Sequence, residues 1–572
     1  MRDRYRGRRM SLSDLNLGFR SSYLDHAQLT AQLRGWAEAY PALVRVGSLG
    51  TTPEGREQWL LTIGPEPDRI RPAAWIDGNM HAVELCGSSV ALAIAEDVIA
   101  LHRGEDRHQL PEHVRERLKG NLFYVLPRMS PDGAEAVLRD GRYVRSNPRD
   151  RREHAPVPRW VARDIDGDGV VLSLRRQDPS GEFVEDRELP GVMLPRRLED
   201  TGPFYKVWPE GTIENYDGTH VPDPHFLSDN DIDLNRNFPY AWKPEPEQVG
   251  AGPYGASEPE SRAVIEFATT HPNIFSWLNL HTFGGCYIRP LGGQPDIKMN
   301  QEDLAIYKQI GEWGEKIGGY PMVSGFEEFI YEPEKPIYGD ITDFIYHTRG
   351  AIAYACELWD LFARLGIERK KKFVDYYSHL TREDLLKLAK LDRELNKGRM
   401  FRPWRRFQHP QLGEVEIGGI AQLVGLNNPP YEILPEICER QSAVYLRVAA
   451  MAPTLELQAR IANGRLEVEV ANTGYLPTYI LDSAKKLALD ARVFIEVEPL
   501  GGCSIDPRDA RTEVGHLEGW GRGLYNEYIF YQRSLGSASR RTVSVPVQGR
   551  GKLRVRAKGL RVGEVVQEIA VE

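Results

Sequence analysis

The sequence predicts an α/β fold with a mixed, largely parallel central sheet flanked by helices, followed by an all-β sandwich domain. Two short apolar runs, at 73–76 and 122–126, are expected to form buried strands, with a long apolar helix between them at 83–101. Strand, helix and strand in this order are typical of parallel βαβ packing. After Pro453, apolar residues alternate with a period of two between Gly and Asn turns, which predicts the sandwich.

The other elements of the α/β unit follow from the same periodicities. At 25–40, Leu29, Leu33 and Trp36 share one face of a predicted helix. Residues 146–230 are rich in Pro, Gly, Arg and Asp and show little periodicity, so we expect an insertion over the surface of this unit. We also expect strands at 44–49, 59–63, 275–280 and 351–358, and helices at 303–318 and 371–397.

Four parts are therefore expected along the chain. They are a basic leader that we expect to be disordered (1–19), the α/β unit (20–397), a polar linker (398–453) and the β-sandwich (454–572). Within the linker, Val444, Val448 and Met451 share a face and predict a short helix. The sandwich strands are expected in the segments LEVEVANTG, YILD, RVFIEVEPL, TVSVPVQ, KLRVRAKG and VVQEIAVE.

Composition argues against several classes of protein. The 572 residues carry 73 Lys and Arg against 82 Asp and Glu, a net charge of −9, which is unfavourable for general binding to nucleic acid or anionic membranes. There is no run of about 18 apolar residues, so no membrane span is expected, and the basic N-terminus lacks the apolar stretch of a secretory signal. Five scattered cysteines without C-x-x-C spacing are expected to be free thiols, which favours a reducing, cytoplasmic location.

An H-x-x-E spacing can bring an imidazole and a carboxylate to one Zn²⁺ ion. The chain holds three such pairs: His81/Glu84, His102/Glu105 and His113/Glu116. The last two lie in highly charged stretches and are expected to be solvated surface. The first pair follows an apolar strand and a glycine turn at the start of a predicted helix, which is the edge of the sheet where α/β proteins place their ligands.

His281 is the candidate for a third ligand, because it follows the apolar run FSWLNL and precedes a Gly-Gly turn. A histidine there is more often an ordinary buried residue, but together with His81 and Glu84 the ligand interpretation is favoured. Two histidines and one glutamate leave a coordination position open for water, as in catalytic zinc sites. Such a site lowers the pKa of its bound water to about 7 and polarises a carbonyl group.

Two further segments carry polar residues suited to catalysis. DIDLNRNFPY holds Asp233, Asn235 and Arg236, and an Arg beside an Asn is suited to binding a carboxylate. AIAYACELWD holds Glu357 in an otherwise apolar strand. Glu357 is either paired with a nearby arginine or held as a general base in a desolvated site.

Taken together, these motifs resemble the zinc metallocarboxypeptidases of the carboxypeptidase A-like family, over residues 20–395. The resemblance implies that His81, Glu84 and His281 bind one zinc ion, and that the carboxylate of Asp233 orients the first histidine. It further implies that Asn235 and Arg236 bind the substrate's C-terminal carboxylate and that Glu357 is the general acid and base.

Further site residues are implied by the same resemblance. Arg145, with Arg142 as the alternative, matches the arginine that polarises the scissile carbonyl. Tyr338 matches a mobile tyrosine that closes over the peptide, with Tyr331 or Tyr346 as alternatives. Counting back from Glu357 places Thr342 at the base of the side-chain pocket, with Asp343 beside it, and Thr342 argues weakly against a preference for Lys or Arg.

The segment Asp164-Ile-Asp166-Gly-Asp168-Gly is a second metal candidate, because D-x-D-x-D-G resembles the first half of a calcium-binding loop. The twelfth position is Arg175, where an EF-hand needs Glu. A loop stabilised by Ca²⁺ and an ordinary Asp/Gly turn therefore both stay open.

The resemblance predicts a zinc-dependent carboxypeptidase, in which water activated by zinc and deprotonated by Glu357 hydrolyses the C-terminal peptide bond of a peptide with a free carboxylate. One alternative is an amidase or deacylase that acts on cell-wall peptides or acylated amino acids. A less favoured alternative is a non-catalytic binding protein whose sandwich recognises a partner.

Overall fold

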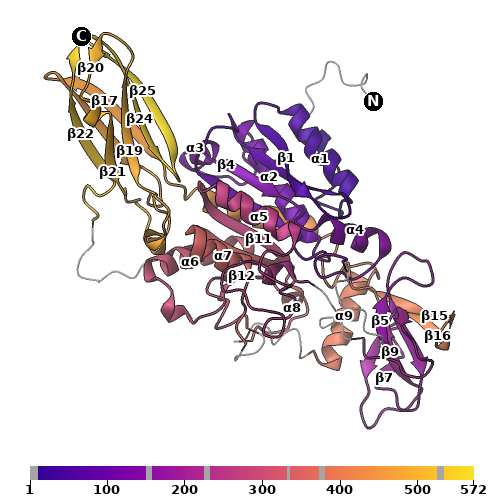
Figure 1. The fold of residues 1–572 in the computed structure, drawn as a ribbon. Helices are drawn as coiled ribbons and strands as arrows, with labels where there is room; N and C mark the ends of the chain where they lie inside the picture. The colour runs from indigo at the N-terminus through magenta and orange to yellow at the C-terminus, as the bar shows by residue number, and fades with distance from the viewer. Residues whose placement is uncertain are drawn as a thin grey trace, which may run out of the picture.

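The computed structural model describes residues 11–149, 158–224, 232–330, 335–370, 372, 380–524 and 534–572. Among these residues the largest sheet has eight strands and lies between two layers of helices (Figure 1). In spatial order its strands are β1 (Val44–Thr51), β2 (Glu57–Ile63), β4 (Leu122–Leu126), β3 (Ala73–Gly78), β11 (Ile274–Thr282), β14 (Ile352–Leu358), β12 (Cys286–Arg289) and β13 (Met322–Ser324).

The centre of this sheet is parallel. β4 pairs with β3, β3 with β11, and β11 with β14, all in parallel, whereas the β1–β2, β2–β4 and β14–β12 pairs are antiparallel. All residues of β3, β4 and β11 are buried, as expected for parallel strands covered on both faces. The predicted mixed, largely parallel sheet is therefore confirmed.

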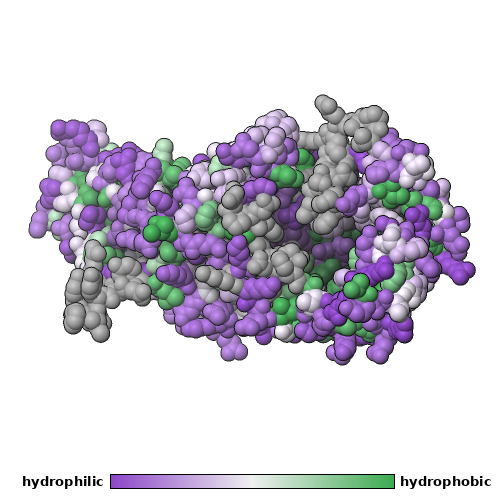
Figure 2. All heavy atoms as spheres, turned by 90° about the horizontal axis from the view of Figure 1, so that it is seen from below, coloured by the Kyte–Doolittle hydropathy of each residue, from purple (hydrophilic) through white to green (hydrophobic). Residues whose placement is uncertain are grey.

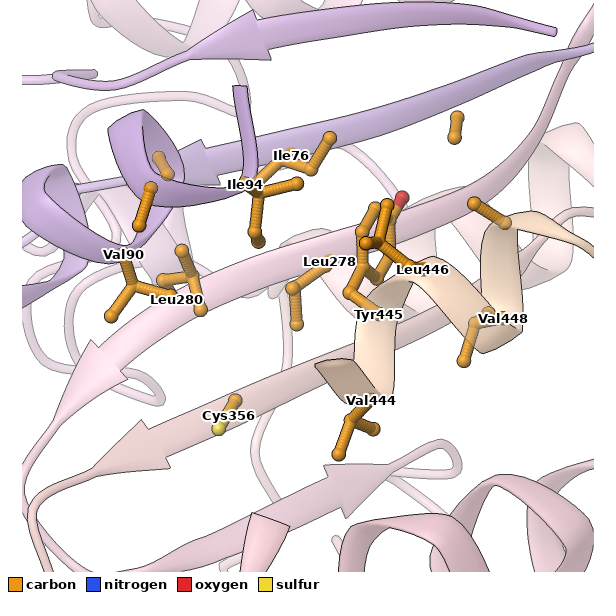
Figure 3. Close-up of a cluster of buried hydrophobic side chains, with 14 of the residues drawn as sticks. Ile76, Val90, Ile94, Leu278, Leu280, Cys356, Val444, Tyr445, Leu446 and Val448 are labelled. Carbon is orange, nitrogen blue, oxygen red and sulfur yellow. The ribbon is translucent and has the colours of Figure 1, made fainter. Parts of the chain in front are cut away.

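Each face of the sheet has its own hydrophobic core. On one face, Ile76, Leu278 and Leu280 pack against side chains of α2 and α10, among them Ile94 and Leu446 (Figure 3). On the other face, Trp75 and Trp277 form a cluster with residues of α5 and α7. The helices of the first face are α1 (His26–Ala39), α2 (Cys86–His102), α6 (Gln301–Trp313) and α10 (Leu434–Ala449), and those of the second are α5 (Pro259–Thr270) and α7 (Ile341–Phe344).

Several short elements connect this framework. The segment predicted as a helix at 303–318 is α-helix up to Trp313 and π-helix over Gly314–Gly318. Of the helix predicted at 371–397, the structure has α9 (Arg382–Glu394), and residues 371 and 373–379 lie outside the described part. The other helices are α3 (Glu112–Gly120), α4 (Pro131–Asp140) and α8 (Leu361–Arg364).

The stretch expected to be a linker is regular structure. Two of its segments, β15 (Phe401–His409) and β16 (Gly413–Ile420), form a hairpin that pairs with β6 of the insertion, and α10 is a full helix of 16 residues. Most β15 side chains are exposed, so the apolar alternation that reveals a strand is missing. The insertion strands are β5 (Arg159–Ala162), β6 (Ser173–Gln177), β7 (Phe183–Glu185), β8 (Met193–Pro195), β9 (Phe204–Pro209) and β10 (Gly211–Glu214).

The C-terminal domain is a β-sandwich around one hydrophobic core. One sheet has the order β17-β18-β22 and the other β21-β19-β24-β25. The YILD segment, predicted as a strand, is instead a turn, in which the buried Ile480 has a φ of 73°. The strands are β17 (Leu455–Ala462), β18 (Arg465–Asn472), β19 (Val493–Pro499), β20 (Cys503–Ser504), β21 (Arg511–Gly515), β22 (Arg540–Pro546), β23 (Gln548–Gly549), β24 (Gly551–Gly559) and β25 (Gly563–Val571).

A buried arginine joins the sandwich to the α/β unit. Arg561, in the turn between β24 and β25, is 2% exposed, and its guanidinium donates to the carbonyl oxygens of Pro272 (3.4 Å) and Arg349. Burial lowers the pKa of Arg561 to about 10. The two domains therefore meet through a desolvated cation that is bound by backbone carbonyl groups.

Figure 2 shows the molecule from below. This face is mostly hydrophilic, carries scattered hydrophobic residues and is hollowed to the right of centre. The five cysteines are buried and form no disulfide bond. No helix in the described part of the chain is long and apolar enough to cross a membrane.

Replacing a buried residue of α10 tests whether this helix belongs to the core. Leu446 is 1% exposed and packs over the sheet, so Leu446→Ala should lower the free energy of unfolding by about 2–5 kcal/mol. Chemical denaturation followed by circular dichroism measures the change. Leu198, which is 98% exposed, provides the control, and Leu198→Ala should change stability by less than about 0.5 kcal/mol. An equally small effect of Leu446→Ala would show that α10 does not belong to the core.

Candidate metal centre and active site

His81 and Glu84 lie in the turn between β3 and α2. The helix begins at Cys86, so the pair precedes it rather than sharing its first turn, and the backbone N–H of Glu84 donates to the carbonyl of His81 (3.0 Å). This turn is held tightly against the sheet. A Cβ at Gly78, the last residue of β3, would lie 2.5 Å from the carbonyl carbon of Gly87, so only glycine permits this approach.

The polar atoms of His81, Glu84 and His281 converge. His81 Nδ1 lies 2.8 Å from Glu84 Oε1, and His281 Nδ1 lies 2.9 Å from Glu84 Oε2. The two Nδ1 atoms lie 3.1 Å apart. All three residues are buried, at 2–4% exposure. The structure thus brings together the three residues that the sequence predicts as zinc ligands.

The outer nitrogens of the two imidazoles have oxygen partners. His81 Nε2 lies 2.9 Å from Asp233 Oδ1, and His281 Nε2 contacts Asn279 Oδ1. Both oxygens are acceptors, so each Nε2 carries the proton and each Nδ1 presents a lone pair to the centre. Two imidazole lone pairs and a carboxylate then face one another.

This donor set fits a divalent metal ion. Nitrogen and carboxylate donors suit Zn²⁺, and three protein ligands leave a position open, as in catalytic zinc sites. A cation at the centre would remove the repulsion between the three electron-rich groups.

Glu357 lies beside this centre on β14. It is the register partner of His281 in the parallel β11–β14 pair, so the two side chains share a face of the sheet. Its Oε2 is buried without a hydrogen-bond partner among the described residues. Burial raises the pKa of Glu357 to about 8, although the nearby His281 opposes the shift. A desolvated carboxyl group with a free oxygen can accept and return a proton.

Asp233 and Arg145 complete the polar surroundings. Arg145 donates to Asp233 Oδ2 (3.0 Å) and to Glu84 Oε1 (3.3 Å), so it lies at the candidate ligands. Arg145 and His81 hold the pKa of Asp233 well below its usual range, although burial acts in the opposite direction. Asp233 therefore stays a carboxylate and orients His81. No contact of this kind is found for the side chain of Arg142 among the described residues.

Asn235 and Arg236 form a short 3₁₀ turn after Asp233, whose carboxylate accepts from the backbone N–H of Asn235 (2.8 Å). Asn235 Oδ1 accepts from the backbone N–H of Ile341 at the start of α7 (3.0 Å). The guanidinium of Arg236 donates to the carbonyl of Asn235 (2.7 Å) and is partly exposed. The turn thus connects the candidate metal site with α7.

The tyrosine candidates lie in different surroundings, and the role predicted for Tyr338 stays a prediction. Tyr338 is partly exposed, its backbone N–H donates to Gln248 Oε1 (3.2 Å), and Lys243 Nζ lies 5.7 Å from its ring centre. Tyr346 is buried and donates to Asp303 Oδ2 (2.8 Å) in the core, so it is a poor alternative. Tyr331 lies outside the described residues.

Thr342 and Asp343 are buried in α7, and both contact a third residue, Asp340. Thr342 donates to Asp340, and Asp343 accepts from the backbone N–H of Gly292 (3.1 Å). Asp340 Oδ2 is buried without a hydrogen-bond partner in the described part of the chain. Burial and the adjacent Asp340 raise the pKa of Asp343 well above its usual range.

Three residues of the site escaped prediction: Asn279, Asp340, and Asp77, which accepts a hydrogen bond from the amide Nδ2 of Asn279. Asn279 precedes His281 by two residues on one strand, so the period of two was a signal that they share a face. Asp340 occupies an N-cap position before α7, where its side chain accepts from the backbone N–H of Asp343, and N-cap aspartates are common without any further role.

The acidic loop brings three carboxylates together, and an arginine and backbone N–H groups contact them. Asp164, Asp166 and Asp168 lie close together, but Arg405 donates to Asp166 Oδ2 (3.0 Å) and Asp168 Oδ2 (2.8 Å). Asp164 accepts from the backbone N–H of Gly167 (2.7 Å). The loop gives the calcium prediction no support.

Comparison with known proteins decides the family. Residues 29–363 match the family described as zinc carboxypeptidase. The chain belongs to this family. Residues 460–570, in the sandwich, match a domain of unknown function.

Individual relatives match only in part. Carboxypeptidase B of Astacus astacus is 30% identical over 125 residues, which cover 22% of this chain and 38% of that protein. Carboxypeptidase M of Mus musculus is 28% identical over 118 residues, which cover 20% of this chain and 25% of that protein. The chain thus covers well under two thirds of either relative. The crystal structure of a carboxypeptidase A from Helicoverpa armigera aligns with a TM-score of 0.41 at 15% identity, over 78% of this chain and 76% of that one.

The zinc carboxypeptidase family implies a Zn²⁺ ion, and metal analysis tests which residues bind it. The purified protein should contain about one zinc per chain, and His281→Ala should lose it, because two ligands from one turn bind zinc weakly. Inductively coupled plasma mass spectrometry after gel filtration measures the content.

His113→Ala is the matched control, because His113 belongs to an exposed H-x-x-E pair and should leave the zinc content unchanged. Equal zinc contents in both variants would contradict the assignment.

Proposed function

We propose that this protein is a zinc-dependent carboxypeptidase that hydrolyses the C-terminal peptide bond of peptides. The observation that carries the proposal is the convergence of His81, Glu84 and His281 beside Glu357, whose Oε2 has no hydrogen-bond partner among the described residues. Membership of the zinc carboxypeptidase family supports the reaction class.

The roles of the residues follow from their positions. Zinc, when bound, supplies a Lewis acid that polarises a carbonyl and acidifies a water molecule. Glu357 takes a proton from the attacking water and passes it to the leaving amine, a role supported by its buried Oε2, which has no hydrogen-bond partner among the described residues. Arg145 lies at Glu84 and Asp233, where it stabilises negative charge on the carbonyl oxygen.

Recognition of the chain end is assigned to Arg236 and Asn235. Asp233 caps their 3₁₀ turn, so the same carboxylate orients His81 and holds this segment. A planar guanidinium suits a bidentate contact with a free α-carboxylate. This assignment makes the enzyme an exopeptidase.

The alternative is an amidase or deacylase that acts on cell-wall peptides or acylated amino acids. It would share zinc and Glu357 but would not need a free α-carboxylate next to the scissile bond. A free-acid peptide and its C-terminal amide therefore distinguish the two activities.

Glu357→Gln tests the general base. The variant should keep zinc and lose about 10²–10⁴-fold in kcat, because an amide cannot accept a proton. The measurement is the steady-state hydrolysis of a panel of blocked dipeptides, with Glu315→Gln, an exposed change, as control. Full activity of Glu357→Gln with zinc bound would contradict the mechanism.

Arg236→Ala tests recognition of the chain end. It should reduce kcat/KM on free-acid peptides about 10–100-fold, the loss expected for charge-assisted hydrogen bonds. The C-terminal amide should be a poor substrate of both proteins. Equal cleavage of the acid and the amide by the wild type would favour the amidase.

The paired carboxyl groups of Asp340 and Asp343 support a preference for a cationic C-terminal side chain. A Cβ built on Gly292 would lie 3.3 Å from Asp340 Oδ2 and 3.4 Å from Asp343 Oδ2, so both oxygens face the same space. Such a pair attracts an ammonium or guanidinium group. This proposal opposes the weak argument from Thr342 against Lys and Arg.

Asp343→Asn should therefore reduce kcat/KM for peptides that end in Lys or Arg about tenfold or more, and should leave peptides that end in Leu nearly unchanged. Competition between a peptide ending in Lys or Arg and a peptide ending in Leu measures the ratio of their kcat/KM values directly. If Asp343→Asn left this ratio unchanged, the two carboxyl groups would not determine the preference for the C-terminal side chain.

A further inference from the structure

A row of buried polar side chains lies on the sheet behind His281. Asp77 on β3 and Asn279 on β11 are register partners in a parallel pair, and both are 0% exposed. They lie on the face that carries Trp75 and Trp277, in the middle of an otherwise hydrophobic cluster. Burying a polar group costs free energy unless the group is hydrogen-bonded, so the hydrogen-bond partners of Asp77 and Asn279 matter.

Both carboxylate oxygens of Asp77 accept hydrogen bonds. Oδ2 accepts from the indole N–H groups of Trp75 (2.7 Å) and Trp277 (2.8 Å), and Oδ1 accepts from the amide Nδ2 of Asn279. The two indole rings are stacked with their centres 4.3 Å apart, which holds both donors in place. Asp77 is therefore fixed as an acceptor, because the two indole N–H groups can only donate.

This arrangement determines the orientation of Asn279. Because Asp77 accepts, Asn279 turns its NH₂ group toward Asp77 and its carbonyl oxygen toward His281 Nε2. That oxygen can only accept, so His281 Nε2 must donate, and the lone pair of the imidazole is left on Nδ1. Nδ1 is the atom that faces Glu84 and His81.

We propose that Asp77 and Asn279 are positioning residues that fix the tautomer and ring orientation of His281, so that its Nδ1 is free to bind the metal. Asp77 acts through Asn279 and touches neither the ligands' inner nitrogens nor the substrate. Asp233 does the same for His81 by direct contact. The inference rests on the proposed zinc site, and nothing in it depends on the nature of the substrate.

Three variants test the inference through the zinc affinity of the whole protein, measured by competition with a chromophoric chelator in the absence of any peptide. In Asp77→Asn, the new amide donates toward position 279. Asn279 then flips and presents its NH₂ to His281, which favours the tautomer protonated on Nδ1. The expected loss of zinc affinity is about 10–100-fold.

In Asn279→Asp, the two facing carboxyl groups share a proton and the oxygen turned toward His281 still accepts from Nε2, so zinc affinity should stay within a few-fold of wild type. The double variant Asp77→Asn/Asn279→Asp restores the order of donors and acceptors. The amide at position 77 accepts from the indoles and donates to the carboxylate at position 279, which accepts from His281. Zinc affinity should return to within a few-fold of wild type, a coupling that independent effects on stability would not produce.

Ser276→Ala is the matched control. Ser276 is buried on β11 and contacts Tyr445 on α10, so its loss should lower stability without changing zinc affinity. Thermal unfolding of every apoprotein, followed by circular dichroism, separates the two effects.

Wild-type zinc affinity in folded Asp77→Asn, or the absence of rescue in the double variant, would overturn the inference and leave the proposed enzyme standing. A wild-type protein that binds no zinc would overturn both.

Discussion

The structure depends on holding three electron-rich groups together in a buried place. The Nδ1 atoms of His81 and His281 lie 3.1 Å apart, and the carboxylate of Glu84 touches both. Lone pairs at this separation repel one another strongly where water is excluded, unless a cation lies between them. The surrounding fold must therefore hold the groups in place whether or not the ion is bound.

The sheet and its loops provide this rigidity. Parallel pairing of β3, β11 and β14 places the turn with His81, the strand end with His281 and the side chain of Glu357 at one edge of the sheet. On one face, α2 and α10 cover the strands with hydrophobic side chains. On the other, the tryptophans around Asp77 enclose a small polar network. Rigid strands therefore support the site, and the insertion and the sandwich lie outside it.

Buried apolar patterns made the core of the protein predictable from sequence. The strand at 122–126 matches β4 at both ends, and His81, Glu84 and His281 converge as expected. The strand β15 escaped because most of its side chains are exposed, which removes the alternation. Asp77 and Asn279 escaped for a different reason: their meaning depends on register between strands that lie far apart in sequence. Spacing within a motif is local, whereas the orientation of an amide is set by partners across the sheet.

The most direct test of the central claim is a crystal structure with anomalous diffraction data collected on both sides of the zinc absorption edge. We expect one anomalous peak per chain, from a zinc ion bound by Nδ1 of His81, Nδ1 of His281 and the carboxylate of Glu84. Asn279 should present its oxygen to His281. A zinc ion bound through an Nε2 atom, or zinc elsewhere in the protein with this cluster empty, would contradict the account.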